Sequence, residues 1–149
     1  SGSYSNFMIC RIRHTGIVVR DLNRAAAFYE ALGFQTWSRE QEEGSFLEQV
    51  IGLEEVRVET AKLKSPCGNS IELLQYHSHT DRKKVELQPP NQLGCSHIAF
   101  SVVSVEESLA LVKKLGGSQV NPPAENGTVR VAYCHDSEGN LLEFVEEIT

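Results

Sequence analysis

The sequence predicts an α+β fold in which two βαβββ repeats form a cupped, mostly antiparallel sheet around one site. The chain aligns with itself at an offset of 83 residues, which places His14 on His97 and Gly33 on Gly116. In each copy an alternating stretch is followed by apolar residues at helical spacing, the order expected of a strand and then a helix. With 149 residues, 40% of them hydrophobic, the chain is long enough to bury one core.

The first repeat is expected at residues 9–77. Alternating β-branched residues predict a strand at residues 9–19, and Asp21 can cap the helix that follows. The helix ends at Gly33, and its apolar stripe consists of Leu22, Ala25, Ala26, Phe28, Tyr29 and Leu32. An acidic, solvated turn is expected at residues 40–43 and a tight turn at residues 66–69. Further strands are predicted at residues 34–39, 56–63 and 70–77.

The second repeat is expected at residues 94–147, after a polar linker at residues 78–93. A strand that begins at His97 leads to Ser104, which forms a capping box with Glu107 and starts a second helix. Further strands are predicted at residues 118–120, 129–134 and 141–146, with a tight turn at residues 136–140. We expect the two repeats to form one globular domain together.

The charge and cysteine content exclude several classes of function. The chain has 14 Lys and Arg against 20 Asp and Glu, a net charge of −6, and its short basic run at residues 82–84 is no nucleic-acid-binding stripe. The four cysteines stand far apart without a CxxC pair, which argues against a zinc knuckle or a redox motif. Unpaired thiols in a reducing compartment are the simpler interpretation.

No apolar run approaches the roughly 20 residues needed to cross a bilayer, and the N-terminus lacks a basic stretch followed by an apolar one. We therefore expect a soluble, unexported, cytoplasmic protein that binds neither membrane nor nucleic acid. The opening residues Ser1, Gly2 and Ser3 are typical of a vector-derived remnant and are left out of the fold.

Residues able to bind a metal occur at matched places in the two repeats. His14 and His97 lie in the first predicted strand of each copy, and Glu72 and Glu143 lie in the last, each after a Gly-Asn turn. A carboxylate in an apolar strand is costly to bury without a partner, so the histidines are its natural companions. Two imidazoles and two carboxylates suit one divalent ion such as Zn, Ni, Co, Mn or Fe, with positions left for water or substrate.

Taken singly, each of these residues has a more ordinary interpretation, because a lone strand histidine usually belongs to the core or surface and a lone strand glutamate usually faces solvent. Their two-fold correspondence favours a metal site. Glu59 is interpreted as an outward-facing neighbour of Arg57. The remaining histidines, His77, His79 and His135, are expected to be solvated, and the large aromatic residues Trp37, Phe46 and Tyr76 are expected to pack.

The repeats and these residues resemble the vicinal oxygen chelate superfamily, which includes glyoxalase I, methylmalonyl-CoA epimerase, extradiol dioxygenases, and fosfomycin- and bleomycin-resistance proteins. The most specific matches are residues 14–34, Ile71-Glu72-Leu73, His97-Ile98-Ala99-Phe100 and residues 136–143. The resemblance implies one divalent metal held by His14, Glu72, His97 and Glu143, with Glu143 as the catalytic base. Glu72 or Glu59 are further candidates for a base on the opposite face. The resemblance also implies a homodimer, with the cup built within one chain or across two.

Two departures from glutathione-dependent glyoxalases stand out. Such enzymes carry an Arg four residues after the first His ligand and an Asn four after the first Glu ligand, and this chain has Val18 and Tyr76 there. Residues 46–53 also look like a cover segment that small glyoxalases lack. The first difference argues against a glutathione-containing substrate, and the cover segment could shape the pocket for another ligand.

Three functions remain open at this point. The first is a metal-dependent lyase or isomerase, glyoxalase-like or epimerase-like, that transfers a proton next to a carbonyl group of a small metal-chelating substrate. The second is a ring-cleavage dioxygenase or thiol transferase on the same scaffold. The third is a non-catalytic protein that sequesters a ligand, as bleomycin-resistance proteins do, although such a protein has no need of two buried carboxylates aligned with two histidines. No organic cofactor is expected.

Overall fold

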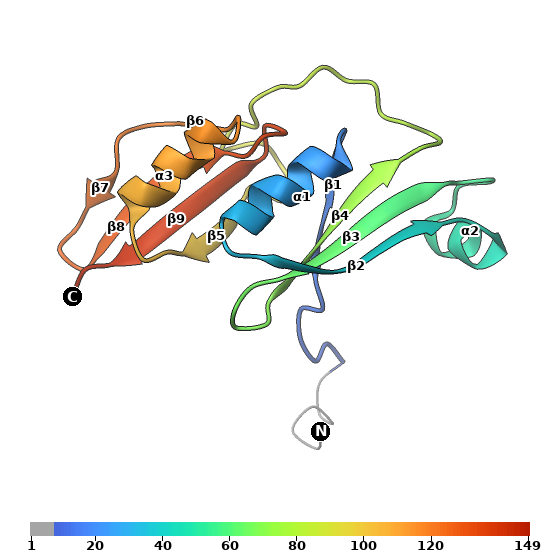
Figure 1. Ribbon diagram of the computed structural model, residues 1–149, viewed down its shortest axis with the longest axis horizontal. Coiled ribbons are helices and arrows are strands. Elements are labelled where there is room, and N and C mark those ends of the chain that lie inside the picture. The colour runs from blue at the N-terminus through green and yellow to red at the C-terminus, as the bar shows by residue number, and fades with distance from the viewer. Residues whose placement is uncertain (1–7) are drawn as a thin grey trace.

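The structure, a computed structural model, describes residues 8–149, so Ser1, Gly2 and Ser3 lie outside the described part. The first half of the chain forms a four-stranded sheet with the strand order β1-β4-β3-β2, in which β1 and β4 are parallel and the other pairs antiparallel. Its elements are β1 (Thr15–Val18), α1 (Leu22–Ala31), β2 (Gln35–Glu42), α2 (Ser45–Ile51), β3 (Val58–Lys64) and β4 (Ser70–Tyr76) (Figure 1).

The second half forms a five-stranded sheet with the order β5-β9-β8-β6, and β7 pairs with β8. Again the first strand is parallel to the last, β5 to β9. Its elements are β5 (Ile98–Ser101), α3 (Val105–Lys114), β6 (Ser118–Gln119), β7 (Ala124–Glu125), β8 (Val129–His135) and β9 (Leu141–Glu147). The first residues of β1, α1 and β2 each lie 83 residues before those of β5, α3 and β6, which confirms the repeat found in the sequence.

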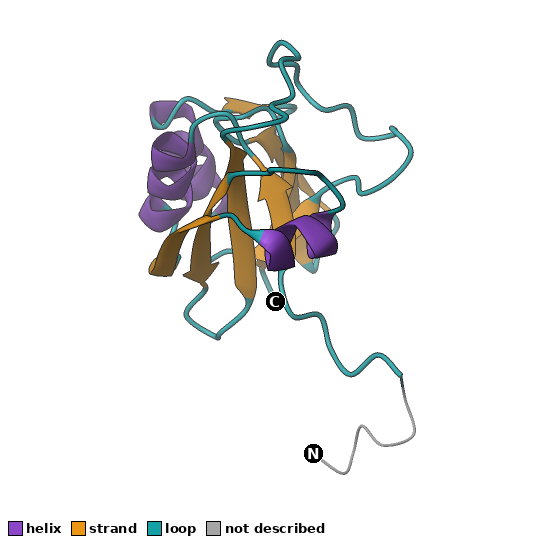
Figure 2. Ribbon diagram, turned by 90° about the vertical axis from the view of Figure 1, so that its right-hand side faces the viewer, coloured by secondary structure: helices purple, strands orange, loops and turns teal. Residues whose placement is uncertain are grey.

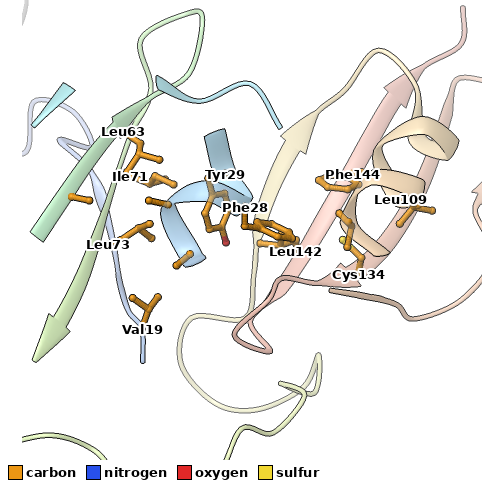
Figure 3. Close-up of a cluster of buried hydrophobic side chains, with 14 of the residues drawn as sticks. Val19, Phe28, Tyr29, Leu63, Ile71, Leu73, Leu109, Cys134, Leu142 and Phe144 are labelled. Carbon is orange, nitrogen blue, oxygen red and sulfur yellow. The ribbon is translucent and has the colours of Figure 1, made fainter. Parts of the chain in front are cut away.

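One apolar core joins the two sheets through α1, which lies between them in Figure 1. Phe28 and Tyr29 on this helix are 1% exposed, and Figure 3 shows them between Leu73 of the first sheet and Leu142 of the second. The ring centroid of Tyr29 lies 6.5 Å from that of Phe100 on β5. The helical stripe that the sequence predicts therefore packs against both halves of the chain.

A buried polar clamp fixes α1 against the second half. The Tyr29 hydroxyl donates a 2.5 Å hydrogen bond to Oδ2 of Asp136, whose Oδ1 accepts the backbone N–H groups of Glu138 and Asn140. Burial and the Asp136 carboxylate raise the pKa of Tyr29 well above its ordinary value, so the phenol stays protonated and donates. The predicted turn at residues 136–140 therefore also carries a contact between the two repeats.

The same turn holds the chain just before α1. The Glu138 carboxylate accepts the backbone N–H of Arg20 at 2.9 Å and that of Asp21 at 3.1 Å. Asp21 in turn caps α1 by accepting the N–H of Arg24, as the sequence predicts. Negative charge at this end also suits the positive N-terminal end of the helix dipole.

Several local expectations are wrong. Residues 9–14 do not extend the first strand, because β4, the parallel neighbour of β1, begins only at Ser70 and offers them no pairing partner. The acidic run at 40–43 is no turn, since β2 continues to Glu42 beside β3. His135 is buried and bonds to the Gln88 carbonyl at 2.8 Å.

The large aromatic residues also differ from expectation, because Trp37 is 54% and Phe46 79% exposed. Phe46 lies on α2, a short helix within the expected cover segment that stands apart from α1 and α3 (Figure 2). The four cysteines are free, as expected. No helix among residues 8–149 is long and apolar enough to cross a membrane.

We expect Tyr29→Phe to lower the free energy of unfolding by about 1.5–3 kcal/mol, because it removes a buried hydrogen bond to a charged acceptor without creating a large cavity. Urea denaturation followed by circular dichroism measures the change. Tyr76→Phe is the matched control, since its hydroxyl makes no hydrogen bond within the described residues. Equal stability of Tyr29→Phe and wild type would show that the clamp contributes nothing.

The same pair of proteins should differ in alkaline stability. The pKa of Tyr29 is raised in the folded protein, so its contribution is complete below about pH 10, where an unfolded tyrosine titrates, and is lost above that pH. Wild type should therefore lose up to about 1.4 kcal/mol per pH unit more than Tyr29→Phe above pH 10. Both proteins retain Cys134, whose pKa burial raises to about 12, so it cancels in the comparison. Parallel stability curves from pH 9 to 11 would contradict this assignment.

Candidate metal centre

The first predicted pair meets across the parallel strands β1 and β4. Gly16 is the register partner of Glu72, and His14 precedes Gly16 by two residues, so the imidazole and the carboxylate share one face of the sheet. Nε2 of His14 lies 3.8 Å from Oε2 of Glu72. The side chains are 39% and 14% exposed, which leaves the carboxylate mostly shielded and the imidazole open.

The second pair repeats this arrangement on β5 and β9. Ala99 is the register partner of Glu143, and His97 precedes Ala99 by two residues. Nε2 of His97 lies 3.0 Å from Oε1 of Glu143, with side chains 25% and 22% exposed. The two His–Glu pairs are thus equivalent in strand, register and orientation.

The surroundings of His97 prepare its Nε2 for a cation. The Ser96 hydroxyl donates its one proton to the Pro90 carbonyl at 3.0 Å, so in its 2.8 Å contact with His97 the donor is the Nδ1–H. In the neutral imidazole Nε2 then carries a lone pair and no hydrogen, and this nitrogen faces an oxygen of Glu143. Two acceptors at this distance repel unless a proton or metal ion lies between them. A second ring N–H bond of this kind is also typical of metal-binding histidines.

The two pairs remain separate within one chain. Across residues 8–149, no three His, Cys, Asp or Glu side chains come close enough to hold a metal ion together. The structure therefore brings His14 to Glu72 and His97 to Glu143, but does not bring all four residues to one point. Each pair supplies half of the predicted donor set.

Glu59 lies away from these pairs but is not outward-facing: it shares its face of β3 with the buried Ala61 and Leu63, and its side chain is 17% exposed. Its partners also differ from the expected Arg57. It faces Gln75 across β3 and β4, whereas Glu72 faces Lys62, and the odd spacing places Glu59 and Glu72 on opposite faces of the sheet. The Glu59 carboxylate contacts Nε2 of His77 and the Arg39 guanidinium, both at 3.1 Å.

Hydrogen bonds from His77 and Arg39, the first being the larger cause, lower the pKa of Glu59. A carboxylate held ionised in this way is a weaker base. Glu59 also lies on the face of the sheet opposite to Glu72, so it cannot act as a base at the predicted metal site.

Other residues at the candidate site carry weak sequence signals. Tyr133 is the register partner of Glu143, and its ring centroid lies 4.9 Å from that of His97. Ser96 orients the same imidazole. A tyrosine in an alternating strand and a serine before a histidine are both common. Only knowledge of which strands pair would have identified Tyr133 and Ser96 as neighbours of the candidate site.

Two mixed sheets with equivalent His–Glu pairs define a class of paired βαβββ proteins. The chain belongs to the glyoxalase/bleomycin resistance protein/dioxygenase superfamily, whose family model matches residues 13–133. It is 27% identical over 141 residues to the lactoylglutathione lyase of Neisseria meningitidis serogroup A, a match that covers 92% of this chain and 91% of that enzyme.

Solved structures agree on the fold. A glyoxalase family protein from Bacillus cereus superposes with a TM-score of 0.90 at 27% identity, over 97% of this chain and 99% of that one. The trypanothione-dependent glyoxalase I of Leishmania major superposes with a TM-score of 0.65 at 23% identity, over 93% and 88% of the two chains. The predicted α+β fold class and the predicted superfamily are confirmed.

Proposed function

We propose that this protein is a divalent-metal-dependent enzyme, a lyase or isomerase, that moves a proton next to a carbonyl group of a small metal-chelating substrate. The equivalence of the pairs His14–Glu72 and His97–Glu143 carries the proposal. The negative charge of two shielded carboxylates, each beside an imidazole, requires a compensating cation. A protein that only sequesters an apolar ligand would gain nothing from placing these carboxylates in its cup.

The donor set fits a single divalent ion. His14 and His97 would supply imidazole nitrogen, and Glu72 and Glu143 would supply carboxylate oxygen and cancel the ionic charge. When bound, such an ion supplies Lewis acidity that polarises a substrate carbonyl and stabilises the negative charge left by proton loss. Nitrogen and oxygen donors of this kind bind several divalent metals, so they do not distinguish among Zn, Ni, Co, Mn and Fe.

Glu143 is the proposed base. Its carboxylate is 22% exposed, so it is open enough to meet a substrate yet shielded enough to avoid full hydration. In a proton transfer it would take the proton from the carbon next to the carbonyl and return it to a neighbouring carbon of the same substrate. Ser96 keeps His97 in one tautomer, and the Tyr133 ring limits how far that imidazole can turn.

The complete site is proposed to form across a homodimer. Within the chain, α1 lies between the two sheets and the His–Glu pairs stay apart. The strands β1 and β5, which follow His14 and His97, are both sheet edges, and among residues 8–149 one side of each has no strand partner. A second copy that places its β5 beside β1 would bring one pair from each chain to the same cup, and two-fold symmetry would create two such cups.

The relatives support an enzyme of the lyase or isomerase type. One similar protein is a lactoylglutathione lyase and another is a glyoxalase I. The Val18 and Tyr76 side chains stand where the glutathione-dependent enzymes are expected to carry Arg and Asn, and Val18 is 58% exposed. We therefore propose the same proton chemistry with a substrate that lacks the glutathione part.

Metal binding tests the proposed site. Wild type should retain about one divalent ion per chain, measured by mass spectrometry after dialysis, and Glu72→Gln and Glu143→Gln should lower the affinity at least about tenfold in a chelator competition. Glu59→Gln is the matched control, because this residue lies on the opposite face.

The reaction is measured with the same proteins, as metal-dependent uptake of deuterium next to the carbonyl of oxo acids, thiohemiacetals and acyl thioesters. Loss of this exchange in Glu143→Gln supports the base. Failure of wild type to bind Ni²⁺, Zn²⁺, Co²⁺ or Mn²⁺ would contradict the site and favour a ligand-sequestering protein. Oxygen uptake with Fe²⁺ in place of proton exchange would favour a dioxygenase.

Mixing two inactive variants tests the assembly. One variant carries His14→Ala and Glu72→Ala, and the other carries His97→Ala and Glu143→Ala. If each cup combines two chains, every mixed dimer has one intact site, so random exchange restores about a quarter of the wild-type sites. A cup built within one chain would give no recovery in the mixture, even where mixed dimers form.

A further inference from the structure

A basic pocket of about 280 Å³ opens directly beside His14. Lys62 and Lys64 on β3 line it together with Trp37 of β2, and His14 itself forms part of the wall. Arg11 and Arg13, from the segment that precedes β1, complete the same wall. No acidic residue lines the pocket.

The basic side chains of this pocket are not engaged in ion pairs within the described chain. None of its four Lys and Arg side chains takes part in an ion pair among residues 8–149, whereas Arg20, Arg39 and Arg130 each pair with a glutamate. The protein as a whole is acidic, with a net charge of −6. In such a chain, unpaired cations gathered around one cavity raise the local concentration of anions there.

The tryptophan reinforces this arrangement. Nζ of Lys62 lies 5.6 Å and Nζ of Lys64 4.9 Å from the centroid of the Trp37 ring, so the ring holds both ammonium groups at the pocket. Trp37 is 54% exposed, although a tryptophan is normally mostly buried. An exposed ring between two lysines is positioned to contact a ligand.

The pocket adjoins the candidate metal pair. Lys62 is the cross-strand partner of Glu72, and His14 belongs to both sites. The second sheet offers no such charge at the equivalent place. There Ala99 and Tyr133 flank Glu143, and Val145 follows on the same face. A ligand held between a Glu72 side and a Glu143 side would therefore meet cations at one end and the uncharged aromatic ring of Tyr133 at the other.

We propose that this pocket binds the anionic group, a carboxylate or a phosphate, of the substrate whose carbonyl is presented to the metal site. The inference rests on the proposed function for the identity of the ligand, while the pocket itself is independent of the metal. Guanidinium groups such as those of Arg11 and Arg13 match the geometry of both anions, and the two lysines add point charges. The substrate class is then a small oxo compound with an anionic end and an apolar end.

Trp37 is the only tryptophan in the chain, so its fluorescence measures this pocket directly. The test titrates metal-free protein, in the presence of chelator, with inorganic phosphate and separately with succinate at constant ionic strength. We expect a saturable fluorescence change with at least one of them, and at least a tenfold weaker affinity in Lys62→Gln/Lys64→Gln. Lys113→Gln/Lys114→Gln on α3 is the matched control and should bind as wild type does.

The stronger of the two anions distinguishes a phosphate-bearing substrate from a carboxylate-bearing one. No saturable change in wild type, or equal affinities in the two double variants, would overturn the proposal. Because the titration excludes metal, it can succeed when the metal site fails, and the reverse also holds. Circular dichroism confirms that the surface Lys→Gln variants keep their fold.

Discussion

The hydrogen bond from Tyr29 to Asp136 is the contact on which the arrangement of the two halves depends. It joins the helix of the first repeat to the final hairpin of the second, and Glu138 of the same hairpin holds the chain that enters that helix. A buried carboxylate is tolerated here because it accepts several donors at once. With α1 fixed between the sheets, the core of the protein lies between them, and the His–Glu pairs do not meet within one chain.

The two halves use the same strand geometry to place chemically matched groups. In both, the first strand runs parallel to the last, so a histidine near its start lies beside a glutamate of the neighbouring strand. The halves differ in what surrounds the pair. Lysines, arginines and a tryptophan lie beside His14, while a serine and a tyrosine orient His97. The repeat thus accounts for the two equivalent His–Glu pairs, and the residues around the pairs are where the two halves differ.

Long-range contacts decided what local sequence patterns had left open. The sequence placed His135 in solvent, but the segment before β5 folds back and buries it against the Gln88 carbonyl. Trp37 was expected to pack, yet a register irregularity between Thr36 and Ser38 interrupts β2 at this residue, and the ring lies over two lysines. Local propensity carries no information about either event, because both depend on chain segments that are distant in sequence.

The sequence by itself determined the repeat, its offset, and most of the order of strands and helices, because hydrophobic periodicity and turn chemistry are local properties. The superfamily followed from the resemblance of its motifs to known members, whereas the short elements α2 and β7 were not predicted. The sequence also selected His14, Glu72, His97 and Glu143 as a set, through their two-fold correspondence. Only the tertiary structure decided that these residues form two separate pairs and that Glu59 faces away from them. The reason is physical: sheet pairing and the packing of α1 set these distances, and both are fixed by contacts between residues far apart along the chain.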